Sequence, residues 1–222
     1  MESLKLYFAP GACSRVPLNA LEELRVPFEA HPLALLRGEQ KRPEYLALNP
    51  SGKVPALQVG DRVITENPAI LFYLATQHPE GRLLPNLEDP VGRAQALGDL
   101  AWCGSALHPL VRQIYLPQLF TAGETHAVRD YAIQAFKPIA SRIAARLDAQ
   151  PWWYGDHWSI MDVYLCWLMG IAQLGGMPEA GAPAIADHIK RVRARASFGR
   201  ALAQEEAAVE RCKIPLPPGV KL

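Results

Sequence analysis

The sequence predicts two domains of different class, an α/β domain followed by an all-helical domain that forms a bundle. The length allows this, because 222 residues are enough for one or two domains. Up to about Pro79, short apolar segments are broken by turn residues, whereas further along the chain apolar residues recur at helical spacing. We therefore expect the first domain at residues 1–79, a linker at 80–91, and the second domain with an extended tail at 92–222.

The first domain is predicted to have the element order β-α-β-α-β-β-α. Pro10-Gly11 stops the first strand, and Gly60-Asp61 joins the last two strands as a hairpin. Pro32 indicates that the second strand lies at an edge of the sheet. Pro68 falls in the first turn of its helix, where a missing N–H costs nothing. Strands are expected at 4–8, 28–35, 54–59 and 62–65, and helices at 14–24, 43–48 and 67–78.

The second domain is predicted to consist of helices only. Pro109 lacks an N–H and disfavours helical geometry at His108, so we expect a kink there. Ser159 and Asp162 have the spacing of a capping box, which favours a structural role for Asp162 over a catalytic one. The tail at 215–218 is too rich in proline to continue a helix. The helices are expected at 92–119, 124–150, 159–174, 182–196 and 198–209.

Composition excludes several classes of function. The chain has 23 Lys and Arg against 22 Asp and Glu, and this balance disfavours a protein that binds nucleic acid through the phosphate backbone. Its apolar stretches are too short for a membrane helix or a signal peptide. No two of the four cysteines have the spacing of a metal site or a dithiol motif. We therefore expect a cytoplasmic protein without a metal, a membrane segment or a nucleic-acid partner.

The turn between the first strand and the first helix contains Cys13. A thiol at the start of a helix meets free N–H groups and the positive end of the helix dipole, which lowers its pKa. A buried, inert cysteine is an equally good interpretation. Ser14 has two interpretations as well: an N-cap residue only, or a hydroxyl donor to a sulfur anion held at this turn.

Two further segments could bind the backbone of a peptide. A cis peptide bond at Val54-Pro55 would turn the N–H and C=O of Val54 toward an extended ligand, although a trans proline on an edge strand is the simpler interpretation. Asn67 is expected to cap the next helix, whose start would bind a carboxylate, and Glu66 beside it would suit an ammonium group. Together they match the amino-acid end of a γ-glutamyl peptide, but a capped helix with a solvated glutamate is the commoner meaning.

These motifs, in this order, resemble those of the cytosolic glutathione transferases, and most of all the bacterial beta class. The resemblance covers nearly the whole chain. It implies a thioredoxin-like first domain and an all-helical second domain, the glutathione transferase fold, together with a homodimer, glutathione as co-substrate and a part in detoxification. The residues that carry it are 10–14 (PGACS), 49–57 (NPSGKVPAL), 65–70 (TENPAI) and 159–162 (SIMD).

The resemblance also implies roles for single residues. Cys13 takes the place beside the glutathione sulfur, and Val54, before a cis Pro55, pairs with the cysteinyl backbone of glutathione. Glu66 and Asn67 occupy the positions that hold the γ-glutamyl end, although many members have Ser at the second of these.

Three cationic or titratable residues are further candidates. Arg37 falls where the beta class has a cation near the glycine carboxylate of glutathione, and Lys53 is a second candidate for this contact; a solvated surface charge is the alternative for both. His108 matches a histidine that faces glutathione, whereas a histidine at the end of an apolar helical face is more often structural. Where the family has an asparagine that makes a contact across the dimer, this chain has Ala101, which puts this contact in doubt.

Three functions follow as hypotheses. In the first, helix N–H groups and a donor from Cys13 or Ser14, the two catalytic candidates, stabilise a glutathione thiolate that attacks a small electrophilic apolar co-substrate. In the second, Cys13 forms a mixed disulfide with glutathione that another thiol resolves, as in a disulfide oxidoreductase. The third is a non-catalytic carrier or interaction protein, which the retention of Cys13, Pro55 and Glu66 argues against.

Overall fold

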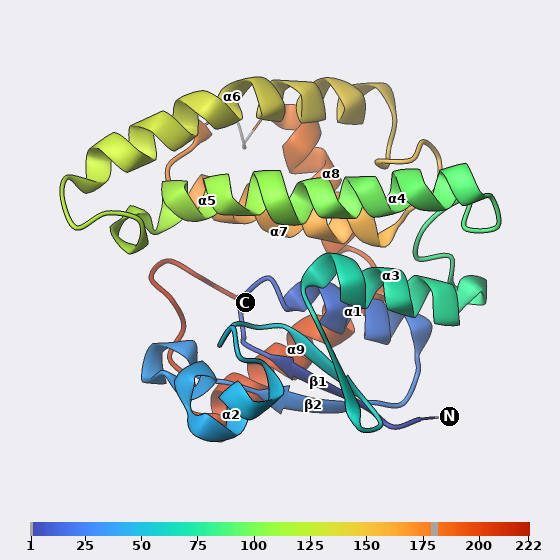
Figure 1. Cartoon of the computed structure of the whole chain (residues 1–222). Helices are drawn as coiled ribbons and strands as arrows, with labels where there is room; N and C mark the ends of the chain where they lie inside the picture. Colours follow the sequence, from blue (N-terminus) through green and yellow to red (C-terminus); the bar gives the residue numbers. More distant parts are fainter. Residues whose placement is uncertain (1, 179–181) are drawn as a thin grey trace. The chain divides into compact units, whose positions relative to one another are not determined.

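The structure is a computed structural model that describes residues 2–178 and 182–222, and its elements are labelled in Figure 1. The chain divides into two compact units. The first contains the residues up to Leu83 together with Arg195–Leu222, and the second contains Leu84–Ala194. The C-terminal residues were predicted to belong to the second domain, whereas their contacts group them with the first unit.

A four-stranded sheet forms the centre of the first unit. Its strands are β1 (Leu4–Phe8), β2 (Glu29–Pro32), β3 (Ala56–Val59) and β4 (Arg62–Thr65). They lie in the order β2-β1-β3-β4, with β2 parallel to β1 and the other pairs antiparallel. The predicted hairpin and the edge position of the second strand are confirmed. In the register, Leu6 is opposite Ala30 on one side and Leu57 on the other.

Helices cover both faces of this sheet. They are α1 (Arg15–Leu24), α2 (Pro43–Leu48), α3 (Asn67–Gln77) and α9 (Ala196–Cys212), so the predicted element order is confirmed. α1 and α3 lie over one face, and α2 lies on the other (Figure 1). Because side chains alternate along a strand, Leu6 and Phe8 are buried on one face while Tyr7 packs against Tyr45 of α2 on the other.

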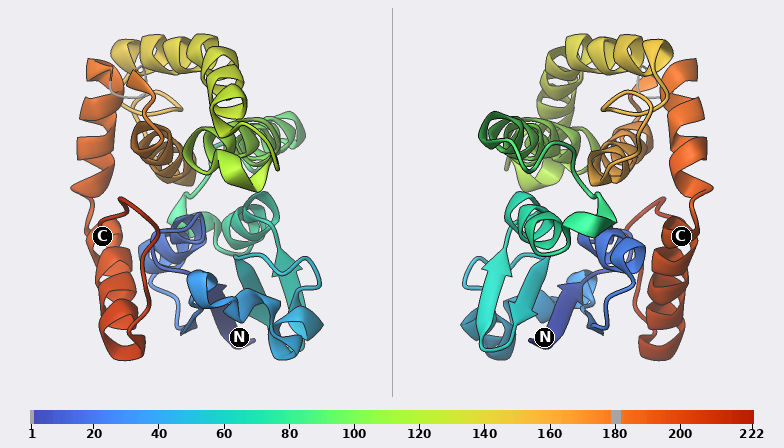
Figure 2. Two further views of the ribbon diagram at one scale, coloured as in Figure 1. Left: turned by 90° about the vertical axis from the view of Figure 1, so that its left-hand side faces the viewer. Right: turned by 90° about the vertical axis from the view of Figure 1, so that its right-hand side faces the viewer.

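The last helix, α9, packs along α1 (Figure 2). Ion pairs join the two helices at several points. Glu22 pairs with Arg200 at 3.0 Å, and Glu23 pairs with Arg195 at 2.6 Å. These pairings explain why the C-terminal residues group with the first unit although they follow the helical domain in sequence.

The second unit contains only helices. They are α4 (Pro90–Trp102), α5 (His108–Tyr115), α6 (Thr125–Ala149), α7 (Ile160–Leu174) and α8 (Pro183–Arg193). Most residues of α7 are buried, and this helix packs against both α5 and α8. None of the described helices is long and apolar enough to cross a membrane.

The predicted kink at Pro109 is wrong. A π-helical turn at Cys103–Leu107 connects α4 to α5, and His108 keeps helical angles of φ −59° and ψ −45°. The wider turn rearranges the backbone hydrogen bonds just before the proline, so that the chain passes the missing N–H without a break. In Figure 1, α4 and α5 consequently run on from one another as one continuous helical ribbon.

The start of α7 depends on Asp162. As predicted, Ser159 and Asp162 form a capping box, and both are buried. The same carboxylate accepts a hydrogen bond from the N–H of Trp153 at 2.7 Å and lies 2.9 Å from Nε2 of His188 on α8. Asp162 thus joins the loop before α7, the helix itself and α8, which confirms its structural role.

Replacing Asp162 by Ala is expected to lower the free energy of unfolding by about 3 kcal/mol, because it leaves several buried donors without an acceptor. Urea denaturation measures this. The control is Asp187→Ala, which removes an exposed carboxylate that pairs with Lys190 on the same helix as His188 and should change stability by less than about 1 kcal/mol. Equal losses in the two variants would contradict the central role of Asp162.

Candidate active site

The turn that links β1 to α1 carries Cys13. The N–H of Ala12 donates to the carbonyl of Ala9, and Gly11 has a φ of +77°, a conformation that favours glycine. Cys13 follows directly and is 8% exposed. Its Sγ lies 3.5 Å from the carbonyl oxygen of Val54, to which it donates. The thiol therefore stands at the start of α1, as predicted, and next to the second predicted segment.

The hydroxyl of Ser14 is bound within the turn. The side chain makes no capping hydrogen bond to α1. The hydroxyl accepts from the N–H of Ala9 at 2.9 Å and donates to the carbonyl of Ala9 at 3.2 Å, and the residue is fully buried. Both hydrogen-bonding functions hold the end of β1 to the start of α1, so Ser14 positions the turn.

The peptide bond between Val54 and Pro55 is cis. Val54 precedes the ladder of β3, which begins at Ala56. Two side chains fix the loop before it: the hydroxyl of Tyr45 and Nδ2 of Asn49 both donate to the carbonyl of Lys53, at 2.6 and 2.8 Å. Asn49 belongs to a motif that the resemblance identified, but no pattern in the sequence pointed to Tyr45.

The third segment differs in detail from the prediction. Glu66 occupies the N-cap position of α3, with a φ of +70°, and is exposed, whereas Asn67 is the first residue of the helix. Nδ2 of Asn67 donates to the carbonyl of Cys13 at 3.2 Å. Its Oδ1 is buried and has no hydrogen-bond partner among the described residues. The expected cap is thus a bridge between the first turns of α3 and α1.

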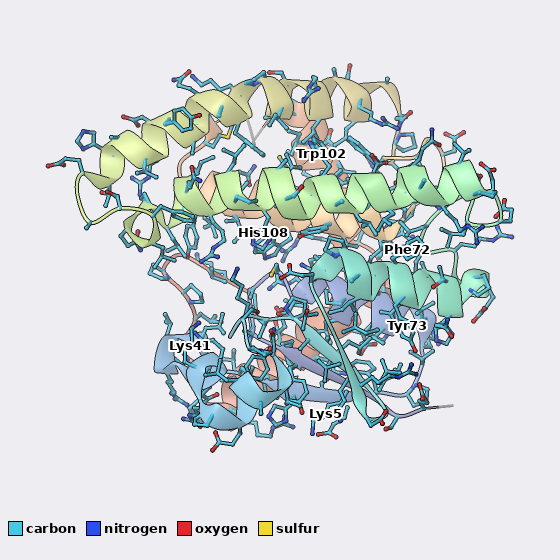
Figure 3. All side chains as sticks on the ribbon, in the orientation of Figure 1. Lys5, Lys41, Phe72, Tyr73, Trp102 and His108 are labelled. Carbon is cyan, nitrogen blue, oxygen red and sulfur yellow. The ribbon has the colours of Figure 1, made fainter. Side chains whose placement is uncertain are left out.

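The two predicted cations lie in different surroundings. The guanidinium of Arg37 donates to the carbonyls of Cys212 and Lys213, at 3.1 and 2.5 Å, and so caps the end of α9. Lys53 is exposed and adjoins Val54. A third cation was missed: a Cβ placed on Gly52 would lie 2.7 Å from Nζ of Lys41, which is labelled in Figure 3. Lys41 is separated from this loop in sequence, so only the structure brings it there.

His108 and Ala101 belong to the second unit. His108 begins α5 (Figure 3), and its ring meets the ring of Trp167 of α7 edge-on at 4.8 Å, with Tyr164 at 6.5 Å. Ala101 lies on α4 and is exposed. The contact of His108 with glutathione stays a prediction.

Comparison with known proteins decides the family. Residues 11–77 match the family model of the glutathione S-transferase N-terminal domain. The chain is 30% identical over 207 residues to a glutathione S-transferase of Xanthomonas campestris, with 91% of this chain and 98% of the relative covered. It is 34% identical over 166 residues to a maleylacetoacetate isomerase of Pseudomonas aeruginosa, with 73% and 77% covered.

The chain belongs to the glutathione S-transferase family. It is also 29% identical over 220 residues to the disulfide-bond oxidoreductase YfcG of Escherichia coli, with 94% of this chain and 98% of that protein covered. Two solved structures of glutathione S-transferases are each 32% identical to it. The beta class enzyme of Sphingomonas chungbukensis has a TM-score of 0.79 with 90% and 98% of the chains covered, and a sphingomonad enzyme complexed with glutathione has 0.78 with 91% and 98%.

The resemblance to the beta class and the predicted fold class are therefore confirmed. In this glutathione S-transferase, the first turns of α1 and α3 are joined through Cys13 and Asn67. Helix starts carry partial positive charge and free N–H groups, so two of them together favour anions. The site combines this electrostatic character with a thiol and with the carbonyl of Val54.

Burial raises the pKa of Tyr45 to about 12, and this makes a prediction about pH. Because the pKa is higher in the folded protein than in the unfolded chain, the phenol's contribution to stability is complete below about pH 10 and is lost as the pH rises through about 12. The tyrosinate absorbance of the wild type and of Tyr45→Phe should therefore coincide up to about pH 11 and diverge above it. Divergence already near pH 10 would contradict the burial effect.

Proposed function

We propose that this glutathione S-transferase binds glutathione in its first unit, with the glutathione sulfur beside Cys13. One observation carries the proposal: Cys13 connects Val54 and Asn67 through hydrogen bonds. These bonds bring together the thiol of Cys13, the backbone of Val54 just before β3, and the start of α3 at Asn67. An extended tripeptide needs these three features for its cysteinyl sulfur, its cysteinyl backbone and its γ-glutamyl carboxylate.

The remaining groups of the ligand have candidate partners as well. Glu66 is exposed at the start of α3 and offers a negative charge to the γ-glutamyl ammonium group. We assign the glycine carboxylate to Lys53, which adjoins Val54, with Lys41, whose Nζ lies beside Gly52, as the second cation. Arg37 is already bound to the end of α9, which supports a structural role for it instead.

The protein acts as a glutathione-dependent transferase. The glutathione thiol loses its proton to solvent, and the N–H groups at the start of α1, together with the Cys13 thiol, stabilise the thiolate. The sulfur then forms a bond to an electrophilic carbon, and the leaving group departs with its electron pair. A thiol is a weak donor to a neutral carbonyl, so Cys13 can exchange Val54, at 3.5 Å, for an anionic sulfur.

A second candidate function is the reduction of disulfides. It is favoured by the presence of a thiol at the start of α1 and by the similarity to a disulfide-bond oxidoreductase. In this reaction, the Cys13 thiolate attacks a glutathione mixed disulfide, becomes glutathionylated and releases the other thiol. A glutathione thiolate then attacks this bond, which regenerates Cys13 and yields oxidised glutathione.

The variant Cys13→Ala distinguishes the two reactions. If Cys13 stabilises the thiolate by one hydrogen bond, kcat/KM for conjugation with a chlorodinitrobenzene substrate should fall by about tenfold, the value of one such bond. If Cys13 is also the nucleophile, reduction of a hydroxyethyl mixed disulfide should be abolished. Steady-state kinetics with both substrates, alongside binding to immobilised glutathione, measure this.

The matched control is Cys212→Ser, because Cys212 is the exposed cysteine among the four. It should leave both activities unchanged. Conjugation retained in full with disulfide reduction lost would assign Cys13 to thiol exchange alone. Binding to glutathione without turnover of either substrate in the wild type would instead support a carrier, and a wild type that does not bind glutathione at all would refute both reactions.

We propose further that the protein is a cytoplasmic homodimer that acts in detoxification. Support for the dimer comes from α4, which exposes large apolar side chains: Val91 is 63% exposed and Leu97 39%.

Leu97→Glu should give a monomer in size-exclusion chromatography with light scattering. Leu174→Glu, at a similarly exposed leucine (44%) at the end of α7, should not change the mass. Equal masses for both variants would contradict this interface.

A further inference from the structure

A buried carboxylate from the far end of the chain reaches the Cys13 turn. Glu205 lies in α9 and is fully buried. Its Oε1 accepts from the N–H of Gly11 at 3.3 Å, across 194 positions of sequence. Its Oε2 accepts from Nε of Arg15 at 2.9 Å and also from Nη2 of the same guanidinium. One oxygen thus binds Gly11, two positions before Cys13, and the other binds Arg15, two positions after it.

Packing alone does not account for a glutamate at this place. Burial raises the pKa of the Glu205 carboxyl, and the Arg15 guanidinium and the Gly11 N–H oppose this. An apolar side chain of similar volume at such a position is often neutral or more stabilising than a buried ion pair. What the carboxylate supplies, and an apolar group cannot, is a fixed acceptor for one backbone N–H and one guanidinium.

The position of this carboxylate is itself well determined. Ion pairs of Glu22 and Glu23 hold α9 along α1 at the other end of the interface. Beyond α9, the tail returns to the same turn: a Cβ placed on Gly11 would lie 2.6 Å from Cγ1 of Val220. Gly11 is therefore held by Glu205 on its N–H and by Val220 against its Cα.

We propose that Glu205 is a positioning residue for Cys13. By binding Gly11 and Arg15 at once, it fixes the backbone on both sides of the thiol, so that Sγ stays at the start of α1 and within reach of the carbonyl of Val54. Only the turnover measurement below rests on the proposed function, because the reactivity of Cys13 toward an alkylating agent requires no glutathione.

The variant Glu205→Asp tests this directly. It keeps the negative charge but shortens the side chain by one methylene, so that the carboxylate cannot reach both Gly11 and Arg15. The matched control is Glu22→Asp, which makes the same change in an ion pair with Arg200 across the same two helices. Comparison at a temperature where both variants are folded separates positioning from a loss of stability.

The first measurement is the rate of alkylation of Cys13 by iodoacetamide as a function of pH, in a Cys212→Ser background. Cys103 is fully buried, and burial raises the pKa of its thiol well above the usual range. Cys166 is about as exposed as Cys13, at 6% against 8%, so it is replaced by Ala in the same background and the reaction then reports on Cys13.

The charged and titratable groups next to Cys13 or to its hydrogen-bond partners include Arg15 on α1, Tyr45 on α2 and Glu205 on α9. Lys53 adjoins Val54, and Glu66 adjoins Asn67 at the start of α3.

In Glu205→Asp, the midpoint of the alkylation profile should shift upward by about half a pH unit, because a loosened turn moves the thiolate away from the positive end of the α1 dipole. The kcat/KM for glutathione should fall by about tenfold. Glu22→Asp should change neither quantity. An unchanged midpoint in Glu205→Asp, a downward shift, or an equal change in the control would overturn the positioning role.

A second pair of variants keeps the proposal testable if Glu205→Asp does not fold. Glu205→Gln preserves the length of the side chain but loses the charge, and Glu22→Gln is its control. A kcat/KM for glutathione at least about threefold lower in Glu205→Gln than in Glu22→Gln is expected. Equal values would refute the proposal. If no variant and not even the wild type uses glutathione, the proposed function fails, while the alkylation profiles still decide the role of Glu205.

Discussion

The first unit depends on the position of the start of α1, because hydrogen bonds from several segments of the chain converge on this turn. Ser14 binds it to the end of β1, Asn67 binds it to the start of α3, and Glu205 binds it to α9. A helix start has N–H groups that the helix itself cannot satisfy. In this turn, side chains bind the N–H of Gly11 and the carbonyls of Ala9 and Cys13, so the backbone around the thiol has little freedom.

Each unit uses one buried carboxylate in a similar way. In the first unit, Glu205 accepts from a backbone N–H and from Arg15. In the second, Asp162 accepts from the backbone at Trp153 and Ser159 and contacts His188. A buried carboxylate is unfavourable unless its oxygens are bound, so each of these side chains demands a specific arrangement of its partners. This is how α9 and α8 obtain defined positions at the end of the chain.

The chemistry of the site follows from the same arrangement. The resemblance places Cys13 beside a glutathione sulfur. In the structure, the thiol donates a weak hydrogen bond to the carbonyl of Val54, which it can give up for another acceptor. A thiol in this position can donate a hydrogen bond to an anion or become a nucleophile, so the same geometry suits both of the proposed reactions. What separates the two reactions is whether the sulfur of the ligand arrives as a thiolate or as part of a disulfide.

The order of the elements, the edge position of β2, the capping box at Ser159 and the place of Cys13 before α1 could be predicted from the sequence, because turn residues, periodicity and local motifs depend on neighbours along the chain. The dipeptide alone favoured a trans Pro55, whereas the resemblance implied the cis peptide bond that the structure has. Packing in the folded protein decided three features: Arg37 binds the end of α9, Asn67 reaches Cys13 instead of capping its own helix, and a π-helical turn carries the chain past Pro109. It also decided that the C-terminal helix belongs with the first unit, through Glu205. Partners 194 positions apart leave no periodic signal, since only packing brings them within hydrogen-bond distance.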